Sequence, residues 1–164
     1  MNVTKNGIII TIPDAEIVRM ALERISEYKS DALARIVAPQ IGQVWEGQGG
    51  VYAGISRGRD LAPDYHLIVG PELESQTDWA AAVKWAASLT GDGHADFALP
   101  FRKEQALSFA NVPELFKQQY YWSCEQHAST SGYAWGQFFS NGGQYHWGKD
   151  GHGRARAVRR LIIQ

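Results

Sequence analysis

The feature that most constrains the fold is a run of aromatic residues and glycines between positions 120 and 147. Nine of the chain's nineteen aromatic residues fall within these 28 positions. They occur in short apolar stretches separated by turn sequences, of which Ser140-Asn141-Gly142-Gly143 is the strongest hairpin signal. Such stretches between tight turns are typical of antiparallel strands. We therefore expect strands over residues 121–123, 133–139 and 144–147, and a closing strand over residues 154–163.

The preceding segment combines strand signals with two helix signals. Runs of β-branched and aromatic residues predict strands over residues 44–45, 51–55 and 65–69, with glycine-rich turns between them. We expect Thr77 to cap a helix over residues 78–89. A second helix is expected to open at Leu99 and to end near Ala110. The pattern predicts an α+β domain in which two helices pack on a twisted antiparallel sheet.

Residues 1–40 are interpreted as an N-terminal strand-helix extension, and residues 41–164 as the main domain. The pattern predicts paired strands over residues 3–12, a helix from Pro13 to about Tyr28, and a connector over residues 29–40. One face of the helix carries an apolar stripe, which is usually buried in a core but in other proteins forms a subunit contact. We expect homo-oligomerisation through this extension. The stripe consists of Val18, Ala21, Leu22, Ile25 and Tyr28, widened by Ile17 and Met20.

Charge and hydropathy argue against several partners. A net charge of -1 and a pI near 6.5 provide no basic field for nucleic acid. The N-terminal apolar run is too short for a signal peptide, and no stretch approaches the ~18 apolar residues of a spanning helix. A single cysteine, Cys124, leaves no internal disulfide. We expect synthesis in the cytoplasm, with neither nucleic-acid binding nor membrane insertion.

Five short motifs occur in an order that resembles a known family. They are Leu-Pro-x-Arg-x-Glu at residues 99–104, Tyr-Trp-Ser-Cys-Glu-Gln at 121–126, Tyr-Ala-Trp at 133–135, Phe-Ser-Asn-Gly at 139–142, and Arg-Ala-Arg-Ala-Val-Arg-Arg at 154–160. This order resembles the bacterial and phage domain family DUF1566, or Lcl C-terminal-like, over roughly residues 65–163. The resemblance implies a C-type-lectin-like fold, in the variant shared with formylglycine-generating enzymes, and a phage or prophage origin. It extends the expected location to the virion.

Three kinds of chemistry have weak support in the sequence. Calcium needs 6–8 oxygen ligands, but Glu125 and Asp150 are the only acids between residues 120 and 153. The resemblance also implies that oxidase chemistry would need a cysteine pair, and the chain has one cysteine. Cys124 with His127 could form a nucleophile and base, although a lone cysteine is more often a small buried hydrophobe. His146, Asp150 and His152 could hold zinc, although loop histidines are more often solvated. We expect no enzymatic activity, catalytic residue, metal or cofactor.

The aromatic surface is the leading candidate for a ligand site. About half of the side chains of a half-solvated sheet point away from the core, and exposed Trp and Tyr provide large, rigid contact areas. The opposite interpretation, in which both faces are covered and the aromatics are core, stays open at this point. The ligand-binding residues predicted from the sequence are Tyr133, Trp135, Gln137, Asn141, Gln144, His146 and Trp147.

The closing segment gathers four arginines, at positions 154, 156, 159 and 160. Because the chain is nearly neutral, we expect these arginines to form salt bridges with acids such as Glu104 or Glu125 and so to hold the terminal strand in place. The functional hypothesis is a non-enzymatic, phage- or prophage-encoded recognition protein of the adhesin or receptor-binding type. Its ligand would be a host-surface glycan or protein. The alternative is a structural or assembly component of a virion or tail.

Overall fold

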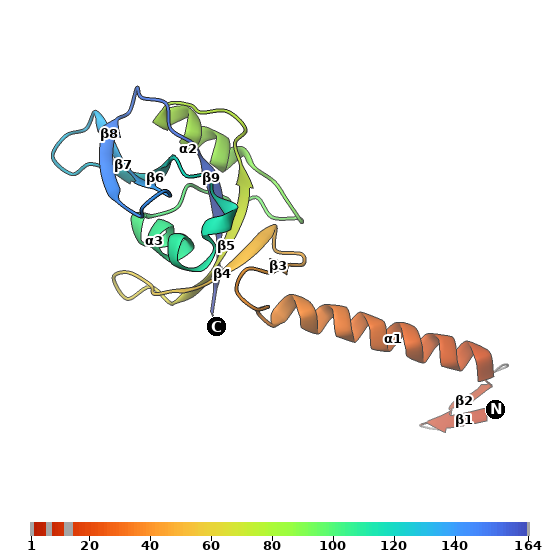
Figure 1. Ribbon diagram of the computed structural model, residues 1–164. Helices are drawn as coiled ribbons and strands as arrows, with labels where there is room; N and C mark the ends of the chain where they lie inside the picture. The colour runs from red at the N-terminus through yellow and green to blue at the C-terminus, as the bar shows by residue number, and fades with distance from the viewer. Residues whose placement is uncertain (1, 6–7, 12–14, 164) are drawn as a thin grey trace. The chain divides into compact units, whose positions relative to one another are not determined.

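The computed structural model describes residues 2–5, 8–11 and 15–163, with side chains described for residues 16–27 and 37–163 (Figure 1). The chain divides into two compact units, Met1–Val37 and Ala38–Gln164. Each unit has its own secondary structure.

The first unit is a hairpin followed by one long helix. Strands β1 (Asn2–Lys5) and β2 (Ile8–Thr11) pair antiparallel, which confirms the predicted paired strands. The predicted turn at residues 6–7 and the predicted helix start at residue 13 lie outside the described residues. Helix α1 (Ala15–Ile36) continues past the predicted end at Tyr28. The expected connector is therefore wrong for residues 29–36, because no glycine or proline interrupts the good helix formers before Pro39.

The apolar stripe of α1 is not buried in a core. Four of its large side chains are half exposed or more: Ile17, Met20, Leu22 and Ile25. One helix and one hairpin provide too little surface to bury such a stripe, since a stable core needs several packed elements. The expectation of a core stripe is wrong for these four side chains.

The second unit contains two antiparallel sheets with helices between their strands in the sequence. The first sheet has the strand order β3-β4-β5-β9 and the second has the order β6-β7-β8. The unit is α+β, and every predicted strand is confirmed within a few residues. The strands are β3 (Val44–Trp45), β4 (Gly50–Ser56), β5 (Tyr65–Glu72), β6 (Tyr120–Gln126), β7 (Tyr133–Phe138), β8 (Gln144–Gly148) and β9 (Arg156–Ile162).

Both predicted helices are present, and one cap differs from the prediction. Helix α2 (Trp79–Ser88) is capped by Asp78, whose Oδ1 accepts a 2.9 Å hydrogen bond from the Ala81 amide. Thr77 was the predicted cap, but its amide instead donates to the Gly153 carbonyl, which ties the chain before α2 to the chain before β9. Helix α3 (Arg102–Asn111) is followed by a short 3-10 helix, η1 (Pro113–Leu115). Helix α3 packs against β4 of the first sheet and β7 of the second (Figure 1).

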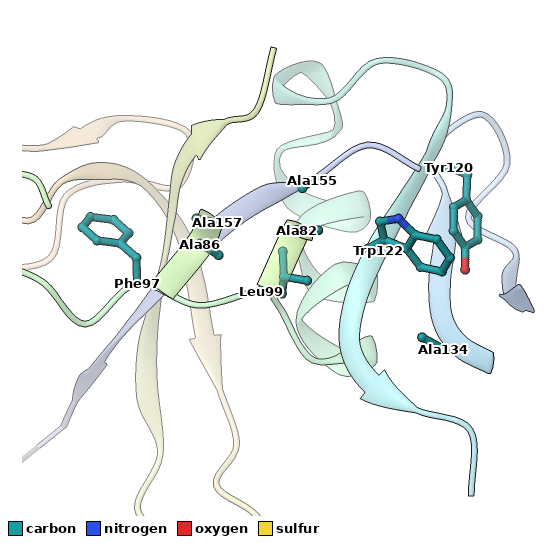
Figure 2. Packing of buried hydrophobic residues seen from close by; sticks show 9 residues of the cluster. All are labelled: Ala82, Ala86, Phe97, Leu99, Tyr120, Trp122, Ala134, Ala155 and Ala157. Atoms are coloured by element: carbon teal, nitrogen blue, oxygen red, sulfur yellow. The ribbon is translucent and has the colours of Figure 1, made fainter. Parts of the chain in front are cut away.

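The largest core cluster joins α2 to strands of both sheets (Figure 2). Ala82 and Ala86 of α2 are fully buried, as are Ala155 and Ala157 in and just before β9. These small side chains let the helix approach the strands closely, and Trp122 of β6 fills the space beside them. The β6-β7-β8 sheet is therefore anchored to the rest of the unit by the aromatic residues of its inner face.

The arginines of the closing strand form ion pairs, as expected from the sequence. Arg160 pairs with Glu104, which confirms one of the two named acids. The other acid, Glu125, pairs with Arg59 instead. The remaining pairs are Arg154 and Arg156 with Glu72, and Arg159 with Asp96. Four arginines therefore fix β9 and the residues before it to β5, α3 and the loop before α3.

Among the described residues, no helix combines the length and the apolar content that a membrane span requires.

Candidate functional site

The residues predicted to bind a ligand are divided between two faces of the β6-β7-β8 sheet. Trp135 pairs across the hairpin with His146, and Ala134 pairs with Trp147. Cross-strand partners point to the same face, and successive residues point to opposite faces. Trp135 and Trp147 therefore lie on opposite faces, which corrects the expectation of one aromatic surface. We call these the Trp135 face, with Tyr133, Trp135, Gln137, Gln144 and His146, and the Trp147 face, with Tyr120, Trp122, Phe138, Tyr145 and Trp147.

A shallow hollow of about 240 Å³ opens on the Trp147 face. Three aromatic side chains, three amide side chains and His152 line it. The volume is slightly below the 300–1,000 Å³ of typical small-molecule pockets, so it suits one sugar ring or one side chain of a partner. The aromatic residues are Tyr120, Phe138 and Trp147, and the amides are Gln76, Gln118 and Gln119.

The floor of the hollow depends on the close packing of Tyr120. Its ring meets Trp147 at 5.3 Å and Phe138 at 5.2 Å, both edge to face. Gly136 makes this position available, because a Cβ there would lie 2.4 Å from Tyr120 Cζ. The Tyr120 hydroxyl donates to the Tyr145 carbonyl at 3.2 Å, and burial raises the pKa of Tyr120. Tyr120 therefore stays neutral, and its ring packs against Trp147.

Trp147 is the exposed part of this aromatic group. Trp147 is 45% exposed. No hydrogen bond joins its indole N–H to another described residue. The ring rests on Tyr120 and approaches Trp122 at 6.3 Å. A tryptophan that packs against buried aromatic rings and is also open to solvent can stack on a ligand and donate one hydrogen bond to it.

The Trp135 face carries a cluster of aromatic and histidine rings. Trp135 stacks on His127 with centroids 5.5 Å apart, and His146 meets Trp135 edge to face at 5.3 Å. The His127 and His146 rings are 4.6 Å apart. Tyr133, which is 41% exposed, completes the cluster beside His146. Trp135 itself is only partly exposed, because neighbouring groups stack on its ring.

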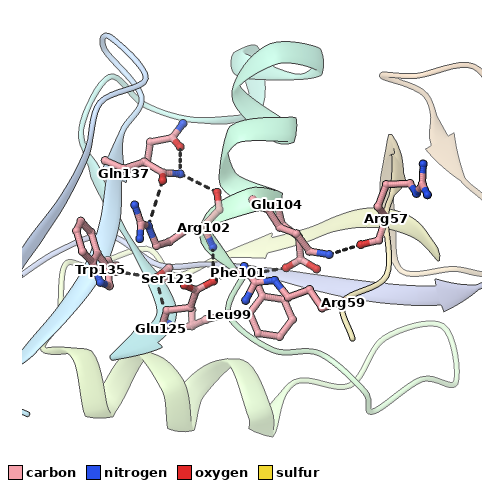
Figure 3. A network of polar contacts seen from close by, with 12 residues as sticks. Arg57, Arg59, Leu99, Phe101, Arg102, Glu104, Ser123, Glu125, Trp135 and Gln137 are labelled. Atoms are coloured by element: carbon pink, nitrogen blue, oxygen red, sulfur yellow. Dashed lines mark hydrogen bonds and ion pairs between the residues drawn. The ribbon is translucent and has the colours of Figure 1, made fainter. Parts of the chain in front are cut away.

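Arg102, which opens helix α3, also covers Trp135 (Figure 3). Its guanidinium lies 3.7 Å from the indole centroid, which is a close cation–π contact. Arg102 Nε donates to Gln144 Oε1 at 3.1 Å, and the Gln144 amide donates back to the Arg102 carbonyl at 2.7 Å. Gln144 therefore holds the arginine in place rather than pointing freely to solvent.

Two other predicted site residues have structural roles. Gln137 is 1% exposed because α3 covers its end of the sheet, and its amide donates to the Gln105 carbonyl at 3.3 Å. The expectation that Gln137 is displayed is wrong. Asn141 is exposed in the β7-β8 turn, where its Oδ1 accepts a 2.9 Å hydrogen bond from the Gly143 amide. This contact stabilises the turn.

The aromatic residues are therefore neither all core nor all displayed. Tyr120, Tyr121, Trp122 and Phe139 are buried, whereas Tyr133, Tyr145 and Trp147 are exposed. Sequence patterns do not mark Arg102 or the three glutamines of the hollow as site residues, and they single out His127 only as a possible base for Cys124. Arg102 and the glutamines come from segments outside the β7-β8 hairpin, so no local pattern marks them.

The candidate nucleophile Cys124 lies in a region that disfavours the thiolate. Burial raises the pKa of Cys124 to about 11, and the nearby Arg160 opposes that rise only in part. A thiol is an effective nucleophile only when deprotonated. The geometry gives no sign of an activated cysteine.

Within the part of the chain that the structure describes, histidine, cysteine, aspartate and glutamate side chains nowhere gather in threes around a point where a metal could bind. His146 lies on the Trp135 face and His152 at the hollow on the Trp147 face, so the pair considered for zinc is divided by the sheet.

A scan against protein-family models and a search of curated proteins found no match to this chain.

Proposed function

We propose that the chain is a non-enzymatic recognition protein that binds a ligand in the hollow on the Trp147 face. The observation that carries the proposal is Trp147 itself, a supported, half-exposed indole with an unused N–H above a hollow lined by three amides. Aromatic side chains give rigid contact area at low cost in conformational entropy, and amides provide both donors and acceptors.

The lining favours an uncharged ligand with hydroxyl groups. No carboxylate or guanidinium is among the residues that line the hollow. Gln119 already accepts from Gln76 and Arg154, so its amide oxygen is positioned rather than free. Gln118 makes no described hydrogen bond and is the amide best placed to contact a ligand. A neutral glycan fits this combination of an aromatic platform and amide rim, and a loop of a host protein is the competing occupant.

The fold and origin are proposals of the same kind. We infer a C-type-lectin-like fold and a phage or prophage source, with the protein acting as an adhesin or receptor-binding protein. Two observations support this inference. The five motifs occur in the family's order, and the second unit combines two helices with antiparallel sheets in the expected order along the chain.

A binding screen tests the proposed function. The full-length protein would be applied to an array of uncharged glycans together with two variants, Trp147→Ala and Trp135→Ala. Trp135 is a matched control because it lies on the opposite face of the same hairpin. We expect Trp147→Ala to weaken binding by about 30-fold or more, the effect of losing a central contact residue, while Trp135→Ala retains binding.

The exposed stripe of α1 favours a second role, in assembly of a virion or tail. Ile17, Met20, Leu22 and Ile25 present apolar area that a second copy of the chain could cover. Helices with apolar stripes commonly associate in this way. Self-association would also present several copies of the Trp147 hollow together and raise the apparent affinity for a repeated glycan. The two roles are therefore compatible.

A further inference from the structure

Arg102 differs from every other arginine of the second unit. Among residues 38–163, all of which the structure describes, Arg102 is the arginine with no carboxylate within ion-pair distance. A half-buried cation without a counter-ion is unusual, because burial of an unpaired charge is costly. The six arginines that do pair are Arg57, Arg59, Arg154, Arg156, Arg159 and Arg160.

The guanidinium is also held in a fixed orientation. The Trp135 ring supports it at 3.7 Å, and its Nε is engaged by Gln144 Oε1 at 3.1 Å. Its two terminal nitrogens, Nη1 and Nη2, have no partner among the described residues. An arginine with a fixed plane and two unused parallel donors matches the geometry of a carboxylate, sulfate or phosphate group.

The surroundings have to tolerate an added negative charge. Glu125 is the nearby acid, and its Oε1 accepts from the Arg102 amide at 3.1 Å and pairs with Arg59 at 3.1 Å. Its charge is therefore already compensated. The rest of the cluster around Trp135 consists of Tyr133, His127 and His146, and so it adds no carboxylate.

We propose that Arg102 binds an oxyanionic group of a ligand on the Trp135 face, in a bidentate contact beside His146. This site lies on the opposite face of the sheet from the hollow and does not depend on it. The oxyanion could be the carboxylate of an acidic sugar or the sulfate or phosphate ester of a charged polymer. All three present the same pair of oxygens to a guanidinium.

The test uses inorganic sulfate, an oxyanion that carries its full charge at neutral pH. The full-length, ¹⁵N-labelled protein would be titrated with sulfate at constant ionic strength against chloride. We expect saturable NMR shifts of the Arg102 Nε–H and Trp135 indole N–H signals. Arg102→Gln should abolish the response. Lys84→Gln, which removes the same charge from the exposed face of α2, should leave the response unchanged.

Several outcomes would overturn the proposal. They are shifts that do not saturate, shifts that chloride reproduces, and an Arg102→Gln variant that is folded by circular dichroism yet still binds sulfate. If Arg102→Gln does not fold, the wild type decides the matter through saturation of its shifts with sulfate and their absence with chloride. Parallel titration with methyl glucuronide separates the sources. Tighter binding of the glucuronide assigns a carboxylate ligand, tighter binding of sulfate assigns a sulfate or phosphate ester, and failure of both rejects the site.

Discussion

Arg160 of β9 donates two hydrogen bonds of 2.7 Å to Glu104 of α3, one from Nε and one from Nη2. The Glu104 carboxylate is fully buried. Glu104 also accepts from the Phe101 amide at 2.7 Å and from the Tyr65 hydroxyl. A buried carboxylate with this many donors is stable only while all of them remain in place. The pair fixes the start of α3, and hence Arg102, against the closing strand.

Replacing Glu104 by Gln should therefore destabilise the protein strongly. The variant leaves Arg160 without its counter-ion and puts an amide N–H against donors, which typically costs about 3–5 kcal/mol. Urea unfolding followed by circular dichroism measures the change, with the exposed Glu74→Gln as control. A loss below about 1 kcal/mol would show that the pair is dispensable.

Gly136→Ala should damage both the fold and the hollow. A Cβ at this position would lie 2.3 Å from the Tyr121 carbonyl oxygen and 2.4 Å from Tyr120 Cζ, so backbone and ring have to move. Overpacking of this kind costs about 1–3 kcal/mol or more. Gly132→Ala is the matched control, because nothing lies within 4 Å of its added carbon. Equal melting temperatures for the two variants would contradict the described packing of Tyr120.

Cys124 should react slowly with alkylating reagents at pH 8. Its pKa, raised from 9.0 to about 11 by burial, lowers the thiolate fraction by about a hundredfold. The protonated thiol is the form the folded state favours, so its contribution to stability is complete below pH 9 and is lost as pH rises through 11. Iodoacetamide labelling followed by mass spectrometry measures the rate, and urea should restore it. Fast labelling of the folded protein would contradict this environment.

Removal of residues 1–37 tests assembly through α1. We expect light scattering coupled to size exclusion to show an oligomer for the full chain and a monomer for the shortened chain, because the exposed stripe is lost. Leu22→Glu with Ile25→Glu in the full chain should have the same effect, since charges in an apolar contact oppose association. Glu27→Gln, an exposed change on the same helix, serves as control. A full-length monomer would reject this role.

The sequence predicts the helices and strands. It does not predict that the candidate site residues lie on two opposite faces of the β6-β7-β8 sheet. Period-two patterns and turn residues marked β6, β7 and β8 correctly because these signals are local. The end of α1 was missed because helix formers continue to Ile36 with no breaker. The opposite placement of Trp135 and Trp147 depends on the register of the β7-β8 hairpin, which places Trp135 opposite His146.

The remaining differences arise from contacts over long sequence separations. Gln137 is buried because α3 packs over it, and Arg102 reaches Trp135 from a helix that begins more than thirty residues earlier. The alternation of residues within a strand does not show which side chains a distant helix covers. The four arginines of the closing segment were interpreted correctly as ion pairs because overall neutrality argues against a basic surface.

The most direct test of the central claim is an NMR titration of the indole N–H signals with a glycan that the array selects. We expect the Trp147 signal to shift and saturate and the Trp135 signal to stay in place. Gln118→Ala should weaken binding while the protein stays folded. A ligand that saturates the Trp135 signal and leaves Trp147 unchanged would contradict recognition through the hollow.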